Sequence, residues 1–220
     1  MYSTTDRKVY ISPCGGYSCE EVNSALKKCL ESFGILSKAA GKTVVLKVNL
    51  LYGAPPSRAV TTNPAVVSEC ARLLYSAGAE KVIIGDSPGG AFTQKALAQI
   101  YDISGMTAAA AESGAELNFD TSVRTLSNPG SCGLPDFSLT GYLYSADMVI
   151  SLSKLKTHRL IRMTAAVKNL YGTVAGQSKR LYHTKMPDKY RFSSMLVDLS
   201  DVAAPDFSII DGIIGMEGDG

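Results

Sequence analysis

The sequence predicts an α/β domain in three layers (α/β/α), with helices on both faces of a mostly parallel sheet. Three segments, VVLKVNLL (44–51), KVIIGD (81–86) and DMVISL (147–152), are short and rich in Val, Ile and Leu. Such near-continuous apolar runs are typical of strands buried on both faces of a parallel sheet. Helix-length amphipathic segments separate them, and this alternation predicts right-handed βαβ crossovers.

Strands and helices are expected in alternation along the whole chain. The strands cover residues 9–12, 44–51, 81–86, 116–119, 147–152 and 207–211, and those at 44–51, 81–86 and 147–152 lie inside the sheet. The helices cover residues 18–33, 63–77, 92–113, with a break near 101–105, and 192–202. Residues 121–144, with an N-P-G turn and several Gly and Ser, predict an excursion from the sheet, either a hairpin or a small lobe.

The helix at 63–77 has the best-defined ends. Thr62-Asn63-Pro64 offers an N-cap side chain followed by proline in the first turn, and Gly78 supplies a C-terminal stop. This pattern predicts where the helix begins and ends, independently of its apolar face.

The 220 residues are expected to form one domain, with 45% apolar residues for its core. The chain finishes in a Gly-rich loop, MEGDG, directly after the last predicted strand, so we expect the natural protein to continue beyond Gly220. No segment approaches the roughly 20 apolar residues of a membrane helix, and the first residues lack the apolar run of a signal peptide. We expect a cytoplasmic protein without membrane contact.

The five cysteines are odd in number and scattered, and no C-x-x-C occurs among them. This argues against a disulfide framework and against a zinc or iron–sulfur site built from this chain alone. We expect free, buried thiols and no metal ligands in the chain.

The charge is concentrated in one segment. Residues 151–191 hold ten Lys/Arg and one carboxylate, a charge of +9, whereas the rest of the chain has twelve bases against nineteen acids, or −7. Such a cationic segment attracts anions, whether phosphate, carboxylate, nucleic acid or an acidic protein. Nucleic acid is not favoured, because the segment lacks interleaved aromatic residues and the net charge is only +2.

Three basic side chains follow the predicted strand at 147–152. If the strand conformation continues, Lys154, Lys156 and His158 share one face. Two ammonium groups beside an imidazole disfavour its protonation and favour a bound anion. The alternative is a solvated basic loop, and in either case Lys156 is expected to be exposed.

Two polar residues interrupt the apolar strand at 44–51. Lys47 and Asn49 lie on one face of it, and a charge inside a doubly buried strand is costly unless it is paired or faces a site. The alternative is that Lys47 extends to water at a sheet edge.

Aspartates end two of the predicted strands. Asp86 precedes Ser87-Pro88-Gly89-Gly90 and a helix expected near Phe92, so Gly89 and Gly90 are candidates to present N–H groups to an anion. A tight strand-to-helix turn explains these glycines equally well, and neither the P-loop nor the dinucleotide fingerprint is matched. Asp86 and Asp211 are candidates to pair with lysines, ligate a metal, or serve as acid and base.

Lys168-Asn169 lies in a segment of small residues, MTAAVKNLYGTVAG, which we expect to pack closely on the sheet. Such packing lowers the pKa of Lys168 and suits it to base or anion-binding chemistry, whereas an amphipathic helix would expose it to water. His183 is expected in a polar loop, as a surface residue or part of a lid. One concavity at the carboxyl edge of the sheet should be lined by Lys47, Asn49, Asp86, Lys156, His158, Lys168 and Asp211.

The strings SLSKLKTHRLIRMTAAVKNLYG and FSIIDGIIGMEGDG resemble the family known as domain of unknown function 362. That family shows a K-x-K-x-H stretch, then A-V-K-N-L-x-G, then D-G-I/V with M-E-G-x-G-P, and VVLKVNLL and TTNPAVV are similar to its N-terminal part. The resemblance implies a frequent link to a ferredoxin-like, metal-binding module with two [4Fe–4S] clusters. The four-cysteine run of such a module is absent here, so any cluster would belong to a C-terminal module beyond this chain.

Two functions remain open from the sequence. The first is a redox-linked enzyme for a small anionic substrate held by lysines, with His158 as acid/base, Lys168 beside it, and Asp86 and Asp211 orienting. Its ligand-binding residues would be Lys47, Asn49, Lys154, Lys156, Asn169, Gly89 and Gly90. The second is a non-catalytic module that docks an acidic partner or a ferredoxin domain.

Overall fold

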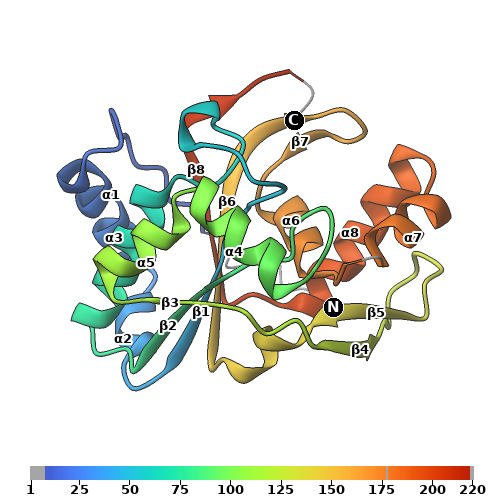
Figure 1. The fold of residues 1–220 in the computed structure, drawn as a ribbon, viewed down its shortest axis with the longest axis horizontal. Coiled ribbons are helices and arrows are strands. Elements are labelled where there is room, and N and C mark those ends of the chain that lie inside the picture. The colour runs from blue at the N-terminus through green and yellow to red at the C-terminus, as the bar shows by residue number, and fades with distance from the viewer. Residues whose placement is uncertain (1–7, 177, 219–220) are drawn as a thin grey trace.

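A twisted, mostly parallel sheet lies between two groups of helices in the computed structural model, which describes residues 8–176 and 178–218 (Figure 1). Within these residues the main sheet has six strands in the order β3-β2-β1-β6-β7, with β8 also paired to β6. Their bounds are β1 Thr43–Lys47, β2 Lys81–Gly85, β3 Glu116–Leu117, β6 Met148–His158, β7 Arg162–Thr164 and β8 Phe207–Met216. Only the β6–β7 pair is antiparallel among these described strands. The predicted fold class and the three interior strands are confirmed.

The helices divide between the two faces of the sheet. One face is covered by α1 (Cys19–Ser32), α2 (Ile35–Ala39), α3 (Pro64–Ser76), α4 (Gln94–Ile103) and α5 (Met106–Ser113). On the other side lie α6 (Ala166–Asn169), α7 (Ser178–Lys185) and α8 (Lys189–Ala203) (Figure 1). Three-residue to five-residue 3-10 turns are η1 (Pro56–Arg58), η2 (Gly141–Ser145) and η3 (Leu170–Thr173).

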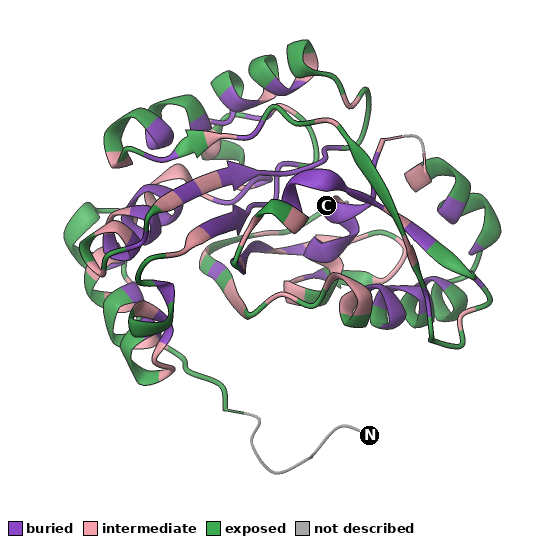
Figure 2. Cartoon of the chain, turned by 90° about the horizontal axis from the view of Figure 1, so that it is seen from below, coloured by how far each residue is buried: buried purple, intermediate pink, exposed green. Residues whose placement is uncertain are grey.

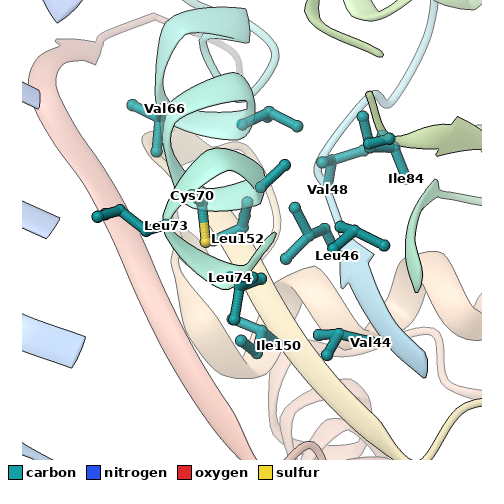
Figure 3. Packing of buried hydrophobic residues seen from close by; sticks show 14 of the residues in the cluster. Val44, Leu46, Val48, Val66, Cys70, Leu73, Leu74, Ile84, Ile150 and Leu152 are labelled. Atoms are coloured by element: carbon teal, nitrogen blue, oxygen red, sulfur yellow. The ribbon is translucent and has the colours of Figure 1, made fainter. Parts of the chain in front are cut away.

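Strand β1 divides its side chains between the two faces by the period of two. Val44 and Leu46 enter the larger core against α3, and Val48 continues that row beyond the strand, as Figure 3 shows. Val45 points the other way, into a small cluster with Tyr142 of η2. Because both faces are covered, most residues of β1, β2 and β6 are buried (Figure 2).

The ends of α3 follow the predicted signals. Asn63 is the N-cap, and its side chain accepts a hydrogen bond from the Ala65 N–H at 2.9 Å. Pro64 opens the helix, and Gly78 follows it with a φ of +92°, a conformation that glycine adopts without a Cβ penalty. The break expected near 101–105 separates α4 from α5.

The excursion at 121–144 is a hairpin. β4 (Val123–Ser127) pairs antiparallel with β5 (Asp136–Thr140) in a separate two-stranded sheet. Its inner residues, including Phe137 and Leu139, pack on α8 in a second core. Asp198 of α8 accepts hydrogen bonds from the Cys132 N–H and the Asn128 side chain, which holds the hairpin loop against the helix.

Several predicted elements differ from those in the structure. β6 continues to His158 and β8 to Met216, past the predicted ends at 152 and 211. Residues 9–12 form no strand: Val9 and Ile11 are 85% and 87% exposed, with no neighbouring strand to pair with. β1 stops at Lys47, because the Asn49 and Leu50 N–H groups bond to the side chains of Thr62 and Asp86 instead of a strand. The segment around His183 is the helix α7, not a loop.

Candidate functional site

A cavity of about 440 Å³ opens beyond the carboxyl ends of β1, β2 and β6, and its volume lies in the range of small-molecule sites. Open α/β sheets bind ligands at this edge. Its lining includes Asn49, Asp86, Ser87, Gly89, Gly90, Lys156, His158, Thr164, Lys168, Tyr171, Gly172, Lys179, Arg180 and His183.

A fully buried ion pair lies at the base of the cavity. The Lys47 Nζ is 2.6 Å from the Asp86 Oδ1, and it also donates to the Val48 carbonyl at 2.6 Å and the Asn169 Oδ1 at 3.0 Å. Burial lowers the pKa of Lys47, and Asp86 opposes this effect. The three N–H donors of Lys47 are therefore used within the protein, and Lys47 does not line the cavity.

Asp86 is held on both oxygens. Its Oδ2 accepts from the Leu50 N–H at 2.7 Å, and its Oδ1 accepts from the Ser87 N–H at 2.9 Å in addition to Lys47. These bonds fix the orientation of the carboxylate, and they give the Leu50 N–H a hydrogen-bond acceptor just after β1 ends. Asp86 is thus held in a fixed orientation at the base of the cavity.

Asn169 links β1 and β6 below the cavity. Its Oδ1 accepts from Lys47 and from the Asn49 amide, each at 3.0 Å. Its Nδ2 donates to the Lys47 carbonyl at 3.2 Å and to the Ser151 hydroxyl at 2.9 Å. The residue is fully buried, so its predicted place in the site is structural rather than ligand-contacting.

Gly172 completes the A-V-K-N-L-x-G stretch by a close backbone approach. A Cβ at this position would collide with the Asp86 Oδ1 and the Lys47 Nζ. The Gly172 carbonyl also accepts from the Ser87 N–H at 3.0 Å. Within this stretch, then, Lys168 reaches the cavity, Asn169 ties the strands together, and Gly172 lets the backbone close over the ion pair.

Three lysines line the cavity. Burial, followed by repulsion from neighbouring cations, lowers the pKa of Lys156 to about 8, and burial with repulsion from Lys47 lowers that of Lys168 to about 8. Burial lowers the pKa of Lys179 to about 7, with Asp86 opposing. Lys156 is 4% exposed, so the expectation of an exposed strand-end lysine is wrong: the Val60 carbonyl accepts from its Nζ at 2.8 Å under the loop before α3.

His158 lies at the end of β6, beside these lysines. Its Nδ1 accepts from the Leu160 N–H at 3.1 Å, which places the proton of the neutral ring on Nε2. Burial, then the positive charges of Lys168 and other neighbours, lowers its pKa to about 4. At neutral pH His158 is therefore an uncharged hydrogen-bond donor, and this geometry favours ligand contact over the predicted acid/base role.

The helix α7 supplies a further wall. Lys179 donates to the Ser87 carbonyl at 2.5 Å, the Ser87 hydroxyl at 2.8 Å and the Val174 carbonyl at 2.6 Å, which fastens α7 to the loop after β2. Arg180 and His183 also line the cavity, and the His183 ring stacks on Phe192 of α8 with centroids 4.6 Å apart. Lys179 and His183 are four residues apart and so lie on one face of a helix. This spacing could have predicted that both line the cavity, but it has no meaning if the segment is taken for a loop.

The glycines after Asp86 line the cavity, but they do not form a helix N-terminus. The Gly89 N–H already donates to the Leu51 carbonyl at 2.6 Å. Helix α4 begins only at Gln94, with Thr93 as its N-cap, beyond the predicted start near Phe92. Gly89 and Gly90 therefore shape a turn beside the cavity.

Lys154 and Asp211 lie outside the cavity lining, in a second buried cluster. Lys154 Nζ donates to Asp211 Oδ2 at 2.8 Å and to the Tyr17 hydroxyl at 2.7 Å, and that hydroxyl donates to Asp211 Oδ1 at 2.8 Å. The second Asp211 oxygen also accepts from the Asn63 N–H, at the N-cap of α3. The expected concavity thus gathers Asn49, Asp86, Lys156, His158 and Lys168, with Lys47 beneath them, but not Asp211.

The cysteines differ in exposure. Cys70 is buried in the core, where burial raises its pKa to about 12, but Cys19 is exposed and Cys14, Cys29 and Cys132 are half-buried. The expectation that all five thiols are buried is wrong, because α1 turns Cys19 toward solvent. Among residues 8–176 and 178–218, no three His, Cys, Asp or Glu side chains gather as metal ligands would.

The fold and the cavity together define an α/β domain with a cationic site at the carboxyl edge of its sheet. The chain belongs to the family Domain of unknown function (DUF362), whose model matches residues 44–220. The resemblance stated from the sequence motifs is confirmed.

Two known proteins are similar to this chain. The thylakoid-associated protein sll1697 of Synechocystis sp. is 34% identical over 218 residues, covering 93% of this chain. The chain spans 62% of the length of that relative. A crystal structure of a Thermotoga maritima protein matches with a TM-score of 0.48 and 12% identity, covering 86% of this chain and 44% of that chain.

In the described part of the sequence, no helix is both long and apolar enough to cross a bilayer.

Proposed function

We propose that this domain binds a small anion, bearing a phosphate or carboxylate group, in the cavity at the carboxyl edge of the sheet. The observation that best supports anion binding is the positive charge of the cavity lining. Lys156, Lys168 and Lys179 reach it from three different elements, β6, α6 and α7. Asp86, the carboxylate among the described lining residues, is already paired with Lys47.

The lowered lysine pKa values support this proposal in a second way. Each ammonium group is held in a half-buried or buried position where its charge is poorly compensated. A bound anion would compensate these charges and raise the three pKa values. Binding near neutral pH should therefore be accompanied by proton uptake.

Calorimetry tests both parts of the proposal. Inorganic phosphate and citrate are titrated into the protein in two buffers of different ionisation enthalpy, so that proton uptake is measured with affinity. Lys156→Met keeps the apolar stem of a buried side chain and should weaken phosphate binding roughly tenfold, the value of one charge-assisted hydrogen bond. Lys189→Ala, an exposed lysine outside the cavity lining in the same basic segment, is the matched control. Equal weakening by both variants would contradict a defined site.

A more specific proposal is that the domain is part of an enzyme in an iron–sulfur-linked redox system. This proposal rests on the family resemblance. Here His158 and Lys168 would contact the substrate, while Asp86 and Asp211, each held in an ion pair, would set the charges around them. Iron and sulfide analysis of the whole natural protein, isolated without oxygen, tests this proposal. A protein free of both would remove the basis for a redox role.

A non-catalytic docking role is the second candidate. It is favoured by the exposed basic side chains of α7 and α8, which are Arg180, Lys185, Lys189 and Arg191. Association with an acidic ferredoxin-type protein that weakens steeply with salt, and is lost on changing Lys185 and Lys189 to Glu, would support it. We also propose a cytoplasmic location, which fractionation of cells tests directly against membrane association.

A further inference from the structure

The three cavity lysines differ in what their amino groups contact. Lys179 Nζ donates to Ser87 and Val174, and Lys156 Nζ donates to the Val60 carbonyl. For Lys168, the described part of the chain offers neither a hydrogen bond nor an ion pair to Nζ, which lies 4.9 Å from the centre of the Tyr171 ring. Among the described residues, Lys168 is thus the lysine of the lining whose amino group makes a ring contact, with Tyr171, in place of a hydrogen bond.

We propose that Lys168 is a nucleophile that forms an imine with the carbonyl carbon of an anionic aldehyde or 2-oxo acid held in the cavity. The inference rests on the proposed function, since Lys156 and the neutral His158 would hold the anionic group. This inference narrows the ligand class to small molecules that have both an anionic group and a reactive carbonyl group.

The step balances without an oxidant or reductant. The lone pair of the neutral Lys168 amine attacks the carbonyl carbon, a C–N bond forms, and the carbonyl oxygen takes up a proton to give a carbinolamine. Loss of that oxygen with the two amine hydrogens releases one water and leaves the C=N bond. Hydrolysis reverses the same steps and returns the free amine.

The surroundings of Lys168 favour this chemistry because they disfavour the ammonium form. Lys47 and Asp86 face it from β1 and the end of β2, Lys156 and His158 from β6, and Lys179 and His183 from α7. The Tyr171 ring lies 4.9 Å from its Nζ. Asp86 is the one carboxylate in this described set, and Lys47 offsets its charge at 2.6 Å. Burial, followed by repulsion from Lys47, lowers the pKa of Lys168 to about 8, with Asp86 opposing, so a substantial share of its amine is neutral in mildly basic solution.

Reductive trapping tests the inference. The protein is incubated with pyridoxal 5′-phosphate, an anionic aldehyde, and cyanoborohydride, and the modified lysines are identified by intact mass and peptide mapping. One adduct should form on Lys168, at least roughly tenfold faster than on the exposed Lys189, because the cavity positions the carbonyl. Inorganic phosphate should protect Lys168, and pyridoxal, which lacks the phosphate, should label it more slowly.

Lys168→Arg separates the inference from the proposed function, because arginine keeps the charge but forms no imine. This variant should lose the protected adduct, and phosphate binding is measured on the unmodified protein, so that the anion site is tested apart from the imine. Its unfolding curve checks that it folds. Retained phosphate binding with labelling spread evenly over surface lysines would overturn the imine and leave the anion site. Absence of both phosphate binding and protected labelling would overturn both.

Discussion

Replacing Asp86 by Asn probes the charge balance beneath the cavity. The carboxylate has three contacts within 2.9 Å, to Lys47 Nζ, the Leu50 N–H and the Ser87 N–H. Asparagine has one acceptor oxygen, so its NH₂ group would face one of these donors. Lys47, which has no solvent exposure, would also keep its charge without a counter-ion.

Breaking a buried pair on one side costs about 3–5 kcal/mol of unfolding free energy, because an uncompensated charge stays in the interior. For a chain of this size that loss lowers the melting temperature by roughly 6–20 °C. The double variant Lys47→Met/Asp86→Asn should recover most of the loss, since it removes the stranded charge and retains the apolar stem. Urea and thermal unfolding followed by circular dichroism measure both. A single variant within about 1 kcal/mol of the unmodified protein, or a double variant no more stable than the single, would refute the reasoning.

Three further predictions concern the neighbouring groups. Gly172→Ala should cost about 1–3 kcal/mol or more in urea unfolding, because its Cβ would enter the buried ion pair; an unchanged midpoint would contradict the close approach. Tyr17→Phe should cost about 1–3 kcal/mol, because it leaves two buried charged partners short of a hydrogen bond, and Tyr190→Phe, at a side chain that is 75% exposed, serves as the comparison. Stability of the ligand-free protein should rise from about pH 7 toward pH 10, since Lys156, Lys168 and Lys179, with folded pKa values of about 8, 8 and 7, release protons that the unfolded chain still holds. Phosphate affinity should fall over the same range, and flat profiles in both measurements would show that these pKa values are not lowered.

The sheet was predictable because its signals are local. Apolar runs of strand length, and an N-cap next to a proline, identify β1, β2, β6 and α3 from a few neighbouring residues. The segment at 9–12 carries the same kind of apolar signal, yet Val9 and Ile11 are exposed. A segment forms a strand only if it has a neighbouring strand to pair with, whatever its amino-acid composition. The rest of the fold decides which sheet edge is available for pairing.

The site was predictable in part. The strand-end rule brought Lys156, His158 and Asp86 together, because parallel strands end at one edge, and the small-residue segment around Lys168 added that lysine. It failed for Asp211, which pairs with β6 at Lys154, where the β6–β8 register shifts. A shift in register is set by packing between distant segments, and the period of two does not reveal it.

The pairing of β6 with β8 also bears on how this chain acquires its structure during translation. Lys154 lies in an interior strand, and its counter-ion Asp211 follows it by 57 residues. Synthesis runs from the N-terminus, so β6 leaves the ribosome well before the strand that neutralises it. Until β8 emerges, closing the sheet around Lys154 would bury an unpaired ammonium, which is strongly unfavourable. The nascent domain is therefore expected to keep the far side of β6 open to water, or to chaperones, until β8 has been made.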